Sequence, residues 1–292
     1  MKYSHFLILS IAIFFYQSSS AQNGVPRANV SNPLTNVADA RTTFFPKVIE
    51  TPNRTPNKSK VWVIIMAGQS NMAGRGQVEP EDTMTNKRIL TIDQQGNIIV
   101  AKEPLNLFEP TMKGLDCGVS FARTLLPKCP RDVSILVIHT AVGGSSINQW
   151  INDSLHRTVH LYSNFDEKVA IGKKYGTIKA ILWHQGESDA NEKGIPKYLS
   201  NMEKLFSMFR TSVGNTKLPI ILGKLGSFSK IPVEFSKINE KMEEYVLRDK
   251  YTRLINTADF IHKGDSLHFN AAGQRAMGQR YANEYLKKFG KK

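Results

Sequence analysis

The sequence is poor in cysteine and has no long apolar segment. Its 292 residues include two cysteines, which excludes a disulfide-rich scaffold. No zinc-ligand spacing and no phosphate-binding loop of the Gly-Lys-Ser/Thr type occur in it. The composition, with 41% hydrophobic and 22% charged residues, also excludes collagen-like, coiled-coil and wholly disordered chains. The class that remains is a globular protein with one large domain or two small ones.

Acidic residues are fewer than basic residues. There are 25 Asp and Glu against 39 Lys and Arg, which gives a formal net charge of +14. An excess of basic residues is typical of nucleic-acid-binding proteins. Here, however, the basic residues are spread along the chain, and the sequence contains neither a basic helix with base-reading spacing nor an RNA-binding aromatic run. We therefore predict a solvated basic surface and no nucleic-acid binding. Positive charge of this kind attracts anionic polysaccharides or membrane surfaces at low salt.

Residues 1–21 have the pattern of a signal peptide. A short head with one lysine precedes an apolar run at residues 6–16, and small residues follow at 19–21. The run is far shorter than the ~20 residues that cross a bilayer. We predict a secreted or periplasmic protein without stable membrane insertion, the alternatives being an N-terminal anchor or a buried strand. Export would permit a disulfide between Cys117 and Cys129, which their spacing alone leaves open.

The rest of the chain divides into a polar leader and one domain. Residues 22–59 contain five prolines and are expected to lie extended along the domain or to be partly disordered. Residues 60–289 alternate between apolar runs and stretches with helical periodicity. The predicted strands are 61–67, 133–138, 180–183, 219–222 and 252–256, and the predicted helices are 119–126, 198–213, 237–247 and 271–289.

This alternation predicts an α/β fold. Unbroken apolar runs are typical of strands that are covered on both faces, and strands alternating with helices form parallel sheets. We expect a three-layer α/β/α sandwich with a central parallel sheet of about five strands. Residues 89–100 interrupt this alternation of strands and helices, and we expect them to form an inserted short hairpin.

Small and polar residues follow the first two predicted strands, where a parallel sheet gathers its ligand sites. Ser70 lies in the small-residue turn after the first strand, so it is either a nucleophile or the N-cap of the next helix. The turn differs from the Gly-x-Ser-x-Gly elbow because Met72 replaces the second glycine. Gly143 and Gly144 follow the second strand, where they could bring a backbone N–H close to a substrate or form a plain turn.

Two further polar segments complete the pattern. After the third strand, Gln185 could donate its amide to a developing oxyanion and Glu187 could orient its neighbours, whereas His184 reads best as a core histidine. Near the end of the chain, Asp265 precedes His268 by three residues. A carboxylate at that spacing can fix the orientation and tautomer of the imidazole, which then accepts a serine proton.

Together these segments resemble a known family. Four blocks in the family's order carry the resemblance over residues 60–289: Gly68-Gln69-Ser70-Asn71-Met72, Gly143-Gly144-Ser145-Ser146-Ile147, His184-Gln185-Gly186-Glu187-Ser188-Asp189 and Asp265-Ser266-Leu267-His268-Phe269. The chain resembles the sialate O-acetylesterase-like domain, the carbohydrate esterase family 6 branch of the SGNH hydrolases, which includes acetylxylan esterase-like proteins.

The resemblance implies roles for individual residues. Ser70 corresponds to the nucleophile, His268 to the general base and Asp265 to its partner. The backbone N–H groups of Ser70 and Gly144 and the side chain of Gln185 correspond to the oxyanion hole. Supporting roles are expected for three polar neighbours: Gln69, Asn71 and Glu187.

The resemblance therefore implies an exported serine esterase that removes O-acetyl groups from carbohydrate and needs no metal or organic cofactor. Its substrate would be an acetylated plant polysaccharide such as xylan, or sialic acid. A general short-chain or lipase-like carboxylesterase and a catalytically weak carbohydrate-binding protein are the alternatives. Trp150 and Trp183 could stack on a sugar or pack in the core. The sequence leaves the particular sugar and the oligomeric state open.

Overall fold

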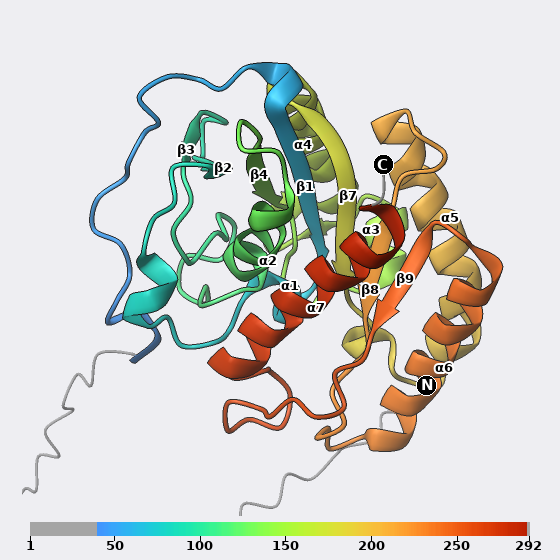
Figure 1. Ribbon diagram of the computed structural model, residues 1–292. Coiled ribbons are helices and arrows are strands. Elements are labelled where there is room, and N and C mark those ends of the chain that lie inside the picture. Colours follow the sequence, from blue (N-terminus) through green and yellow to red (C-terminus); the bar gives the residue numbers. More distant parts are fainter. Residues whose placement is uncertain (1–39, 291–292) are drawn as a thin grey trace, which may run out of the picture. The chain divides into compact units, whose positions relative to one another are not determined.

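The computed structural model describes residues 40–290, so the predicted signal peptide lies outside the described residues. A central sheet has the strand order β3-β2-β4-β1-β7-β8-β9 (Figure 1). All neighbouring pairs are parallel except β2 and β3. The strands are β1 (Val61–Gly68), β2 (Ile89–Ile92), β3 (Ile98–Val100), β4 (Ser134–His139), β7 (Thr177–His184), β8 (Ile220–Gly223) and β9 (Thr252–Ile255).

The predicted α/β class is confirmed, but the predicted strand count was too low. Each of the five apolar runs forms a strand, namely β1, β4, β7, β8 and β9. The inserted segment at 89–100 does form a hairpin, β2 and β3. Because β2 also pairs in parallel with β4, this hairpin extends the central sheet to seven strands instead of standing apart from it.

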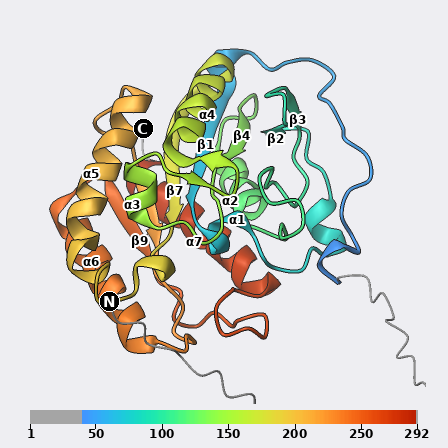
Figure 2. The same cartoon turned by 180° about the vertical axis from the view of Figure 1, so that it is seen from behind.

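Helices cover both faces of the sheet. Helices α2 (Gly118–Leu125) and α7 (Ala271–Phe289) pack against each other on one face (Figure 1). The other face, seen in Figure 2, carries α3 (Ile147–Ile151), α4 (Leu161–Tyr175), α5 (Ile195–Val213) and α6 (Pro232–Arg248). The four predicted helices correspond to α2, α5, α6 and α7. No helix between residues 40 and 290 is both long and apolar enough to cross a membrane.

The central strand β1 is buried on both sides. Val63 and Ile65 join the cluster beneath α4 and α5, while Ile64 and Met66 join the cluster beneath α2 and α7. All four side chains are fully buried, which explains why the run is apolar without alternation.

Trp150 and Trp183 both belong to the core. They are fully buried, and their rings meet edge to face with centroids 5.6 Å apart. Burial leaves neither ring a face to offer a sugar, so both tryptophans act in packing.

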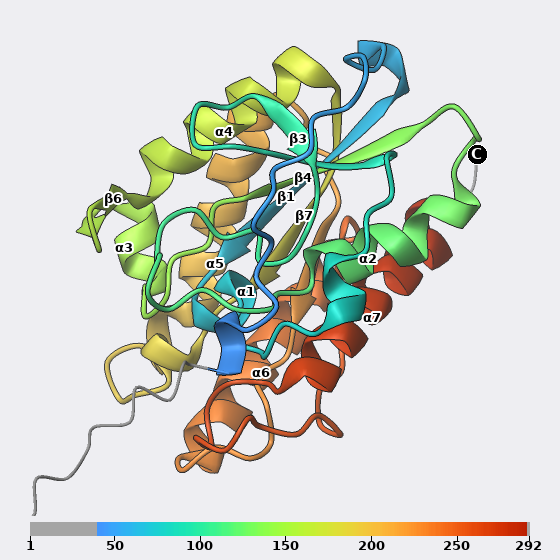
Figure 3. The same cartoon turned by 90° about the vertical axis from the view of Figure 1, so that its left-hand side faces the viewer.

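The leader follows the domain from residue 40 onward. The Val100 N–H donates to the carbonyl of Glu50 at 2.7 Å, and the Glu50 carboxylate pairs with Lys102 at 2.5 Å. These contacts lay the segment along the edge of the sheet beside β3 (Figure 3). The cysteines are free thiols: Cys117 is buried and Cys129 is half-buried.

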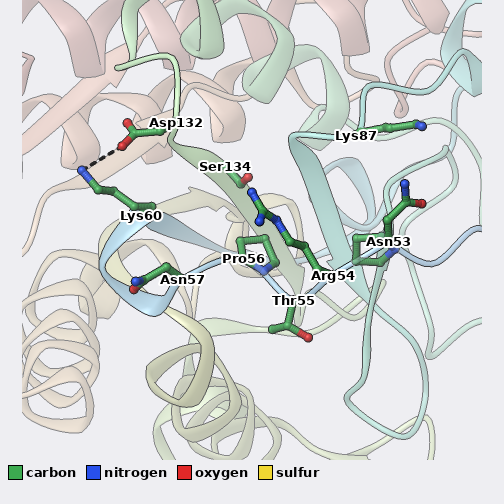
Figure 4. Close-up of a pocket in the computed structure, with 10 residues that line it drawn as sticks. Asn53, Arg54, Thr55, Pro56, Asn57, Lys60, Lys87, Asp132 and Ser134 are labelled. Atoms are coloured by element: carbon green, nitrogen blue, oxygen red, sulfur yellow. Dashed lines mark ion pairs between the residues drawn. The ribbon is translucent and has the colours of Figure 1, made fainter.

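The amino edge of the sheet carries a cavity of about 560 Å³ (Figure 4). Its lining includes Arg54, Lys87 and Ser134, together with Lys60, which pairs with Asp132 at 2.9 Å. None of the residues lining it contributes a buried side-chain polar atom that lacks a hydrogen-bond partner. The polar segments predicted to carry chemistry lie at the opposite edge.

Candidate active site

Three loops converge at the carboxyl end of β1. This strand lies between β4 and β7, so the chain leaves all three parallel strands at the same edge, at the switch point where such sheets bind ligands. Gly68 ends β1 with φ +138°, and a Cβ there would lie 2.1 Å from the carbonyl oxygen of His184. Only glycine allows the ends of β1 and β7 to approach this closely.

Ser70, His268 and Asp265 are linked by hydrogen bonds. The His268 Nε2 lies 3.0 Å from the Ser70 Oγ, and its Nδ1 lies 2.7 Å from an oxygen of Asp265. Ser70 begins the short helix α1 (Ser70–Ala73), and His268 lies just before α7. When Nδ1 donates to the carboxylate, Nε2 is left able to accept the serine proton. The structure thus brings Ser70 to the Asp265–His268 pair, although 198 positions separate Ser70 from His268 along the chain.

The charge of Asp265 is fixed by its surroundings. One carboxylate oxygen accepts from the backbone N–H groups of Leu267 at 3.0 Å and His268 at 2.8 Å. Partial burial would raise the pKa of Asp265, but these bonds and the imidazole lower it to about 2. The side chain is therefore ionised at neutral pH and able to orient the imidazole.

Asn71 fixes the backbone on both sides of His268. Its Oδ1 accepts from the Phe269 N–H at 2.9 Å, and its Nδ2 donates to the Leu267 carbonyl at 3.2 Å. The same Nδ2 donates to Glu187 at 2.8 Å. These contacts tie the turn that carries Ser70 to the loop that carries the imidazole, a geometry that suits the supporting roles predicted for Asn71 and Glu187.

His184 lies beneath the site. It is fully buried, and its Nε2 donates to the Lys224 carbonyl at 3.0 Å. Burial lowers the pKa of His184, which keeps the ring neutral. The core-histidine interpretation favoured by the sequence fits this geometry.

Two backbone N–H groups in the loops after β1 and β4 have no internal acceptor in the described part of the chain. The N–H groups of Ser70 and Gly144 have no hydrogen-bond acceptor within residues 40–290. Gly144 is exposed and has φ +78°, a conformation that favours glycine. The Ser145 Oγ lies 2.9 Å from the Val142 carbonyl and 3.3 Å from the Gly68 carbonyl at the end of β1. Free backbone donors beside a nucleophile are what an oxyanion hole requires.

Gln185 is placed below the surface. It is fully buried, and its Nε2 lies within hydrogen-bonding distance of Gln69 Oε1 (3.1 Å), the Ser145 carbonyl (3.1 Å) and Asp189 (2.5 Å). An amide nitrogen carries two hydrogens, and three internal acceptors already compete for them. This geometry favours a supporting role, and the expected direct contact with an oxyanion stays a prediction.

Gln69 connects the first and third loops. Its Oε1 accepts from the Gln185 amide and from the backbone N–H groups of Gly186 at 3.4 Å and Ser188 at 3.2 Å. Backbone donors fix which end of the amide is oxygen. Gln69 therefore holds the loop after β7 beside Ser70, consistent with the supporting role predicted for it.

A buried ion pair that the sequence did not reveal contacts the loop that carries Gly143 and Gly144. Glu109 accepts from Arg75 and from the Gly143 N–H, both at 2.8 Å, and both charged side chains are about 2% exposed. Burial would raise the pKa of Glu109, but Arg75 and these hydrogen bonds lower it. The pair is distant in sequence and belongs to no motif, so no local pattern could have indicated it.

A cavity of about 470 Å³ adjoins the hydrogen-bonded trio. Asp265 and His268 form part of its wall, and Arg41 and Lys263 add positive charge to it. Arg41 donates to the Met112 carbonyl at 2.8 Å. A substrate in this cavity would lie against the imidazole.

A comparison with protein families matches residues 60–287 to the family described as carbohydrate esterase, sialic acid-specific acetylesterase. The chain belongs to this family. It is therefore a carbohydrate esterase. The resemblance to the sialate O-acetylesterase-like domain is confirmed, while the assignment to carbohydrate esterase family 6 stays a prediction. The four sequence blocks lie within the matched residues.

Individual relatives agree with this assignment. The esterase is 28% identical over 248 residues to a probable carbohydrate esterase of Arabidopsis thaliana, covering 78% of this chain and 91% of that protein. The crystal structure of the Arabidopsis protein has a TM-score of 0.69 at 27% identity and covers 78% of this chain and 98% of that one.

Two more distant structures share the fold. NanS has a TM-score of 0.62 at 16% identity, covering 80% of this chain and 98% of its own. A carbohydrate acetylesterase from Xanthomonas citri has a TM-score of 0.58 at 16% identity, covering 80% of this chain and 57% of that one.

Replacing Gln185 by alanine should lower stability more than turnover. Loss of the buried amide leaves Asp189 and Gln69 with fewer partners, which costs about 1–3 kcal/mol and lowers Tm by roughly 3–10 °C. The kcat of the folded enzyme should stay within about tenfold of wild type. Melting temperature and kcat measured on Gln185→Ala and Gln185→Glu distinguish a supporting role of Gln185 from direct donation to the oxyanion. Unchanged Tm with kcat reduced by roughly 10²–10³ would instead support a direct oxyanion donor.

Proposed function

We propose that the esterase removes O-acetyl groups from an acidic sugar, with sialic acid as the representative substrate, through Ser70, His268 and Asp265. The observation that carries the proposal is the chain of hydrogen bonds from Asp265 through His268 to the Ser70 Oγ, at 2.7 and 3.0 Å. The backbone N–H groups of Ser70 and Gly144, which have no acceptor among residues 40–290, would supply donors for the oxyanion.

The proposed reaction has two halves. The Ser70 Oγ attacks the acetyl carbonyl carbon while His268 takes the hydroxyl proton, and the Ser70 and Gly144 N–H groups donate to the oxyanion. His268 returns the proton to the sugar oxygen, which leaves as a hydroxyl and leaves acetyl-Ser70. Water then loses a proton to His268 and attacks this ester, acetate leaves, and the serine recovers its proton.

The charge of the cavity favours an acidic sugar over a neutral one. Arg41 and Lys263 line the same cavity as His268, so a substrate carboxylate could be attracted close to the reacting ester. The family description names sialic acid. Acetylated xylan or another neutral plant polysaccharide is the second candidate, because the serine chemistry does not depend on the charge of the sugar.

Replacing Lys263 by methionine should raise KM selectively for an acidic substrate. An exposed charge contributes less than about 1 kcal/mol, so we expect a two- to fivefold increase in KM for O-acetyl sialic acid and none for p-nitrophenyl acetate. The neutral ester controls for the proximity of Lys263 to Asp265, at 3.6 Å. Lys87→Met makes the same charge change at the opposite edge of the sheet. Equal increases for both substrates would refute the charge argument.

Chain-length preference separates the remaining functions. An acetylesterase should hydrolyse acetyl esters much faster than butyryl or longer esters, whereas a lipase-like enzyme should not. A binding protein with a weak site would release no acetate at all. A screen for acetate release from O-acetyl sialic acid, acetylated xylan and acetylated pectin tests the proposal directly.

We also propose that the protein is exported to a secreted or periplasmic location. Support comes from the charged head, the apolar run at 6–16 and the small residues at 19–21. N-terminal sequencing of the mature protein would test this proposal. A chain that still began at Met1 would contradict it.

A further inference from the structure

Two side chains from a neighbouring hairpin, those of Arg157 and His156, form hydrogen bonds with the Gly143 carbonyl oxygen. Arg157 donates from Nε at 2.8 Å, and the His156 Nε2 lies 2.9 Å from the same oxygen. The Gln149 amide lies 3.4 Å from the His156 Nδ1, so Gln149 donates to Nδ1 and the ring proton sits on Nε2, facing the carbonyl.

The opposite side of Gly143 is held as well. Its N–H donates to Glu109 at 2.8 Å, and Glu109 pairs with Arg75, also at 2.8 Å. The Arg157 Nε lies 3.6 Å from the same carboxylate. Gly143 is thus fixed at both its N–H and its carbonyl, although the two consecutive glycines would leave this turn unusually free to change conformation.

The hairpin has a strained turn. It consists of β5 (Leu155–His156) and β6 (Val159–His160) and lies beside α3 (Figure 3). Arg157 has φ +48° and Thr158 has φ +70°, values that cost a residue with a side chain of order 1 kcal/mol or more. Strain of this kind persists where the surrounding contacts hold it, and here those contacts include the bonds to Gly143.

We propose that His156 and Arg157 are positioning residues for the oxyanion hole. The Gly143 carbonyl and the Gly144 N–H belong to one planar trans peptide, so they point in opposite directions. Fixing the carbonyl on the hairpin side therefore aims the N–H away from the hairpin, as donation to an oxyanion at Ser70 requires. Hydrogen bonds to the carbonyl also polarise the peptide and strengthen its N–H as a donor.

This inference rests on the proposed serine mechanism, and it predicts a specific kinetic pattern. Donation to the oxyanion matters in the transition state and not in substrate binding. Removing one direct donor costs roughly 10²–10³ in kcat, so weakening a donor through its peptide should cost less. We expect Arg157→Ala to lower kcat about tenfold and the double variant with His156→Ala about 100-fold, with KM for an activated acetate ester within twofold.

The experiment measures kcat, KM and Tm together with the Kd of a small alkyl boronic acid, which forms a negatively charged tetrahedral adduct with a catalytic serine. Boronate affinity should fall by the same factor as kcat, and Tm should stay within a few degrees of wild type. Leu155→Ala is the matched control, because Leu155 lies in the same hairpin, is 63% exposed and has no polar group to offer Gly143.

Three results would overturn the assignment. Wild-type kcat in the folded double variant would remove the hairpin from the mechanism. An increase in KM without loss of kcat or boronate affinity would make Arg157 a substrate-binding residue instead. A similar loss in Leu155→Ala would indicate a general effect of hairpin disruption. Ser70→Ala in the same series keeps the two hypotheses apart, since activity surviving in that variant refutes the serine mechanism itself.

Discussion

Replacing Ser70 by alanine should abolish nearly all ester hydrolysis while leaving the fold intact. The Ser70 Oγ has one side-chain partner in the described structure, His268 at 3.0 Å, so its removal breaks no structural network. Without the hydroxyl no acetyl-enzyme can form, and loss of a triad nucleophile lowers kcat by roughly 10⁴–10⁶. The residual rate would come from the remaining donors and from substrate binding.

Turnover of p-nitrophenyl acetate and covalent labelling by a fluorophosphonate measure this effect independently. The wild-type protein should gain one label by intact mass, and Ser70→Ala should gain none. Ser134→Ala is the matched control, because Ser134 is also buried but lies at the amino edge of the sheet (Figure 4). Activity of Ser70→Ala within tenfold of wild type would remove the serine from the mechanism.

The sequence could predict the positions of the strands because β1 and its neighbours are buried on both faces. Burial on both faces leaves an unbroken apolar run, which is visible without a structure. Because parallel strands end at one edge, the polar segments after them could be expected to meet there. The contacts among Ser70, His268 and Asp265 follow from that topology, although 198 positions separate the serine from the histidine.

What the sequence could not predict depends on tertiary contacts. The hairpin at 89–100 has the pattern of any short hairpin, and only its pairing with β4 makes it part of the sheet. The side chain of Gln185 follows a strand end, as an oxyanion donor would, but buried Asp189 at 2.5 Å draws its amide inward. Arg157 and Glu109 belong to no motif, because both act on Gly143 through space.

The structure bears on the predicted role of Gln185 in the same way, although that role stays a prediction. A strand-end glutamine with a free amide and one with a bonded amide are identical in sequence. Their difference lies in acceptors contributed by other segments, here Gln69, Ser145 and Asp189. Residue type and spacing therefore locate such a site, while hydrogen-bond partners assign the function of each side chain within it.

Asp265→Asn should lower kcat by up to about 10⁴ with little change in shape. In the wild-type protein, Asp265 accepts from the His268 ring at 2.7 Å and from two backbone N–H groups. Asparagine can still accept from the backbone through its oxygen, but its NH₂ then faces Nδ1 as a donor. The imidazole must adopt the tautomer with its proton on Nε2, which cannot take the proton of Ser70.

The pH dependence provides a second measurement on the same pair. Because the pKa of Asp265 is lowered to about 2, the carboxylate is charged above that pH and only its protonation near pH 2 would discharge it. The kcat/KM profile of the wild-type enzyme should therefore rise with pH in one limb, as the imidazole loses its proton, with no carboxyl limb above about pH 3. Asp259→Asn, which alters an exposed aspartate paired with Arg280, should keep both the rate and the profile.

Two results would contradict this account of the pair. If Asp265→Asn retained more than a tenth of wild-type kcat, the carboxylate would not control the tautomer. If wild-type activity instead rose steadily as the pH fell below about 5, a protonated carboxyl group would be the better catalyst, since a neutral imidazole becomes scarcer as the pH falls. The serine mechanism requires the opposite sign, because its base must be unprotonated before Ser70 can attack.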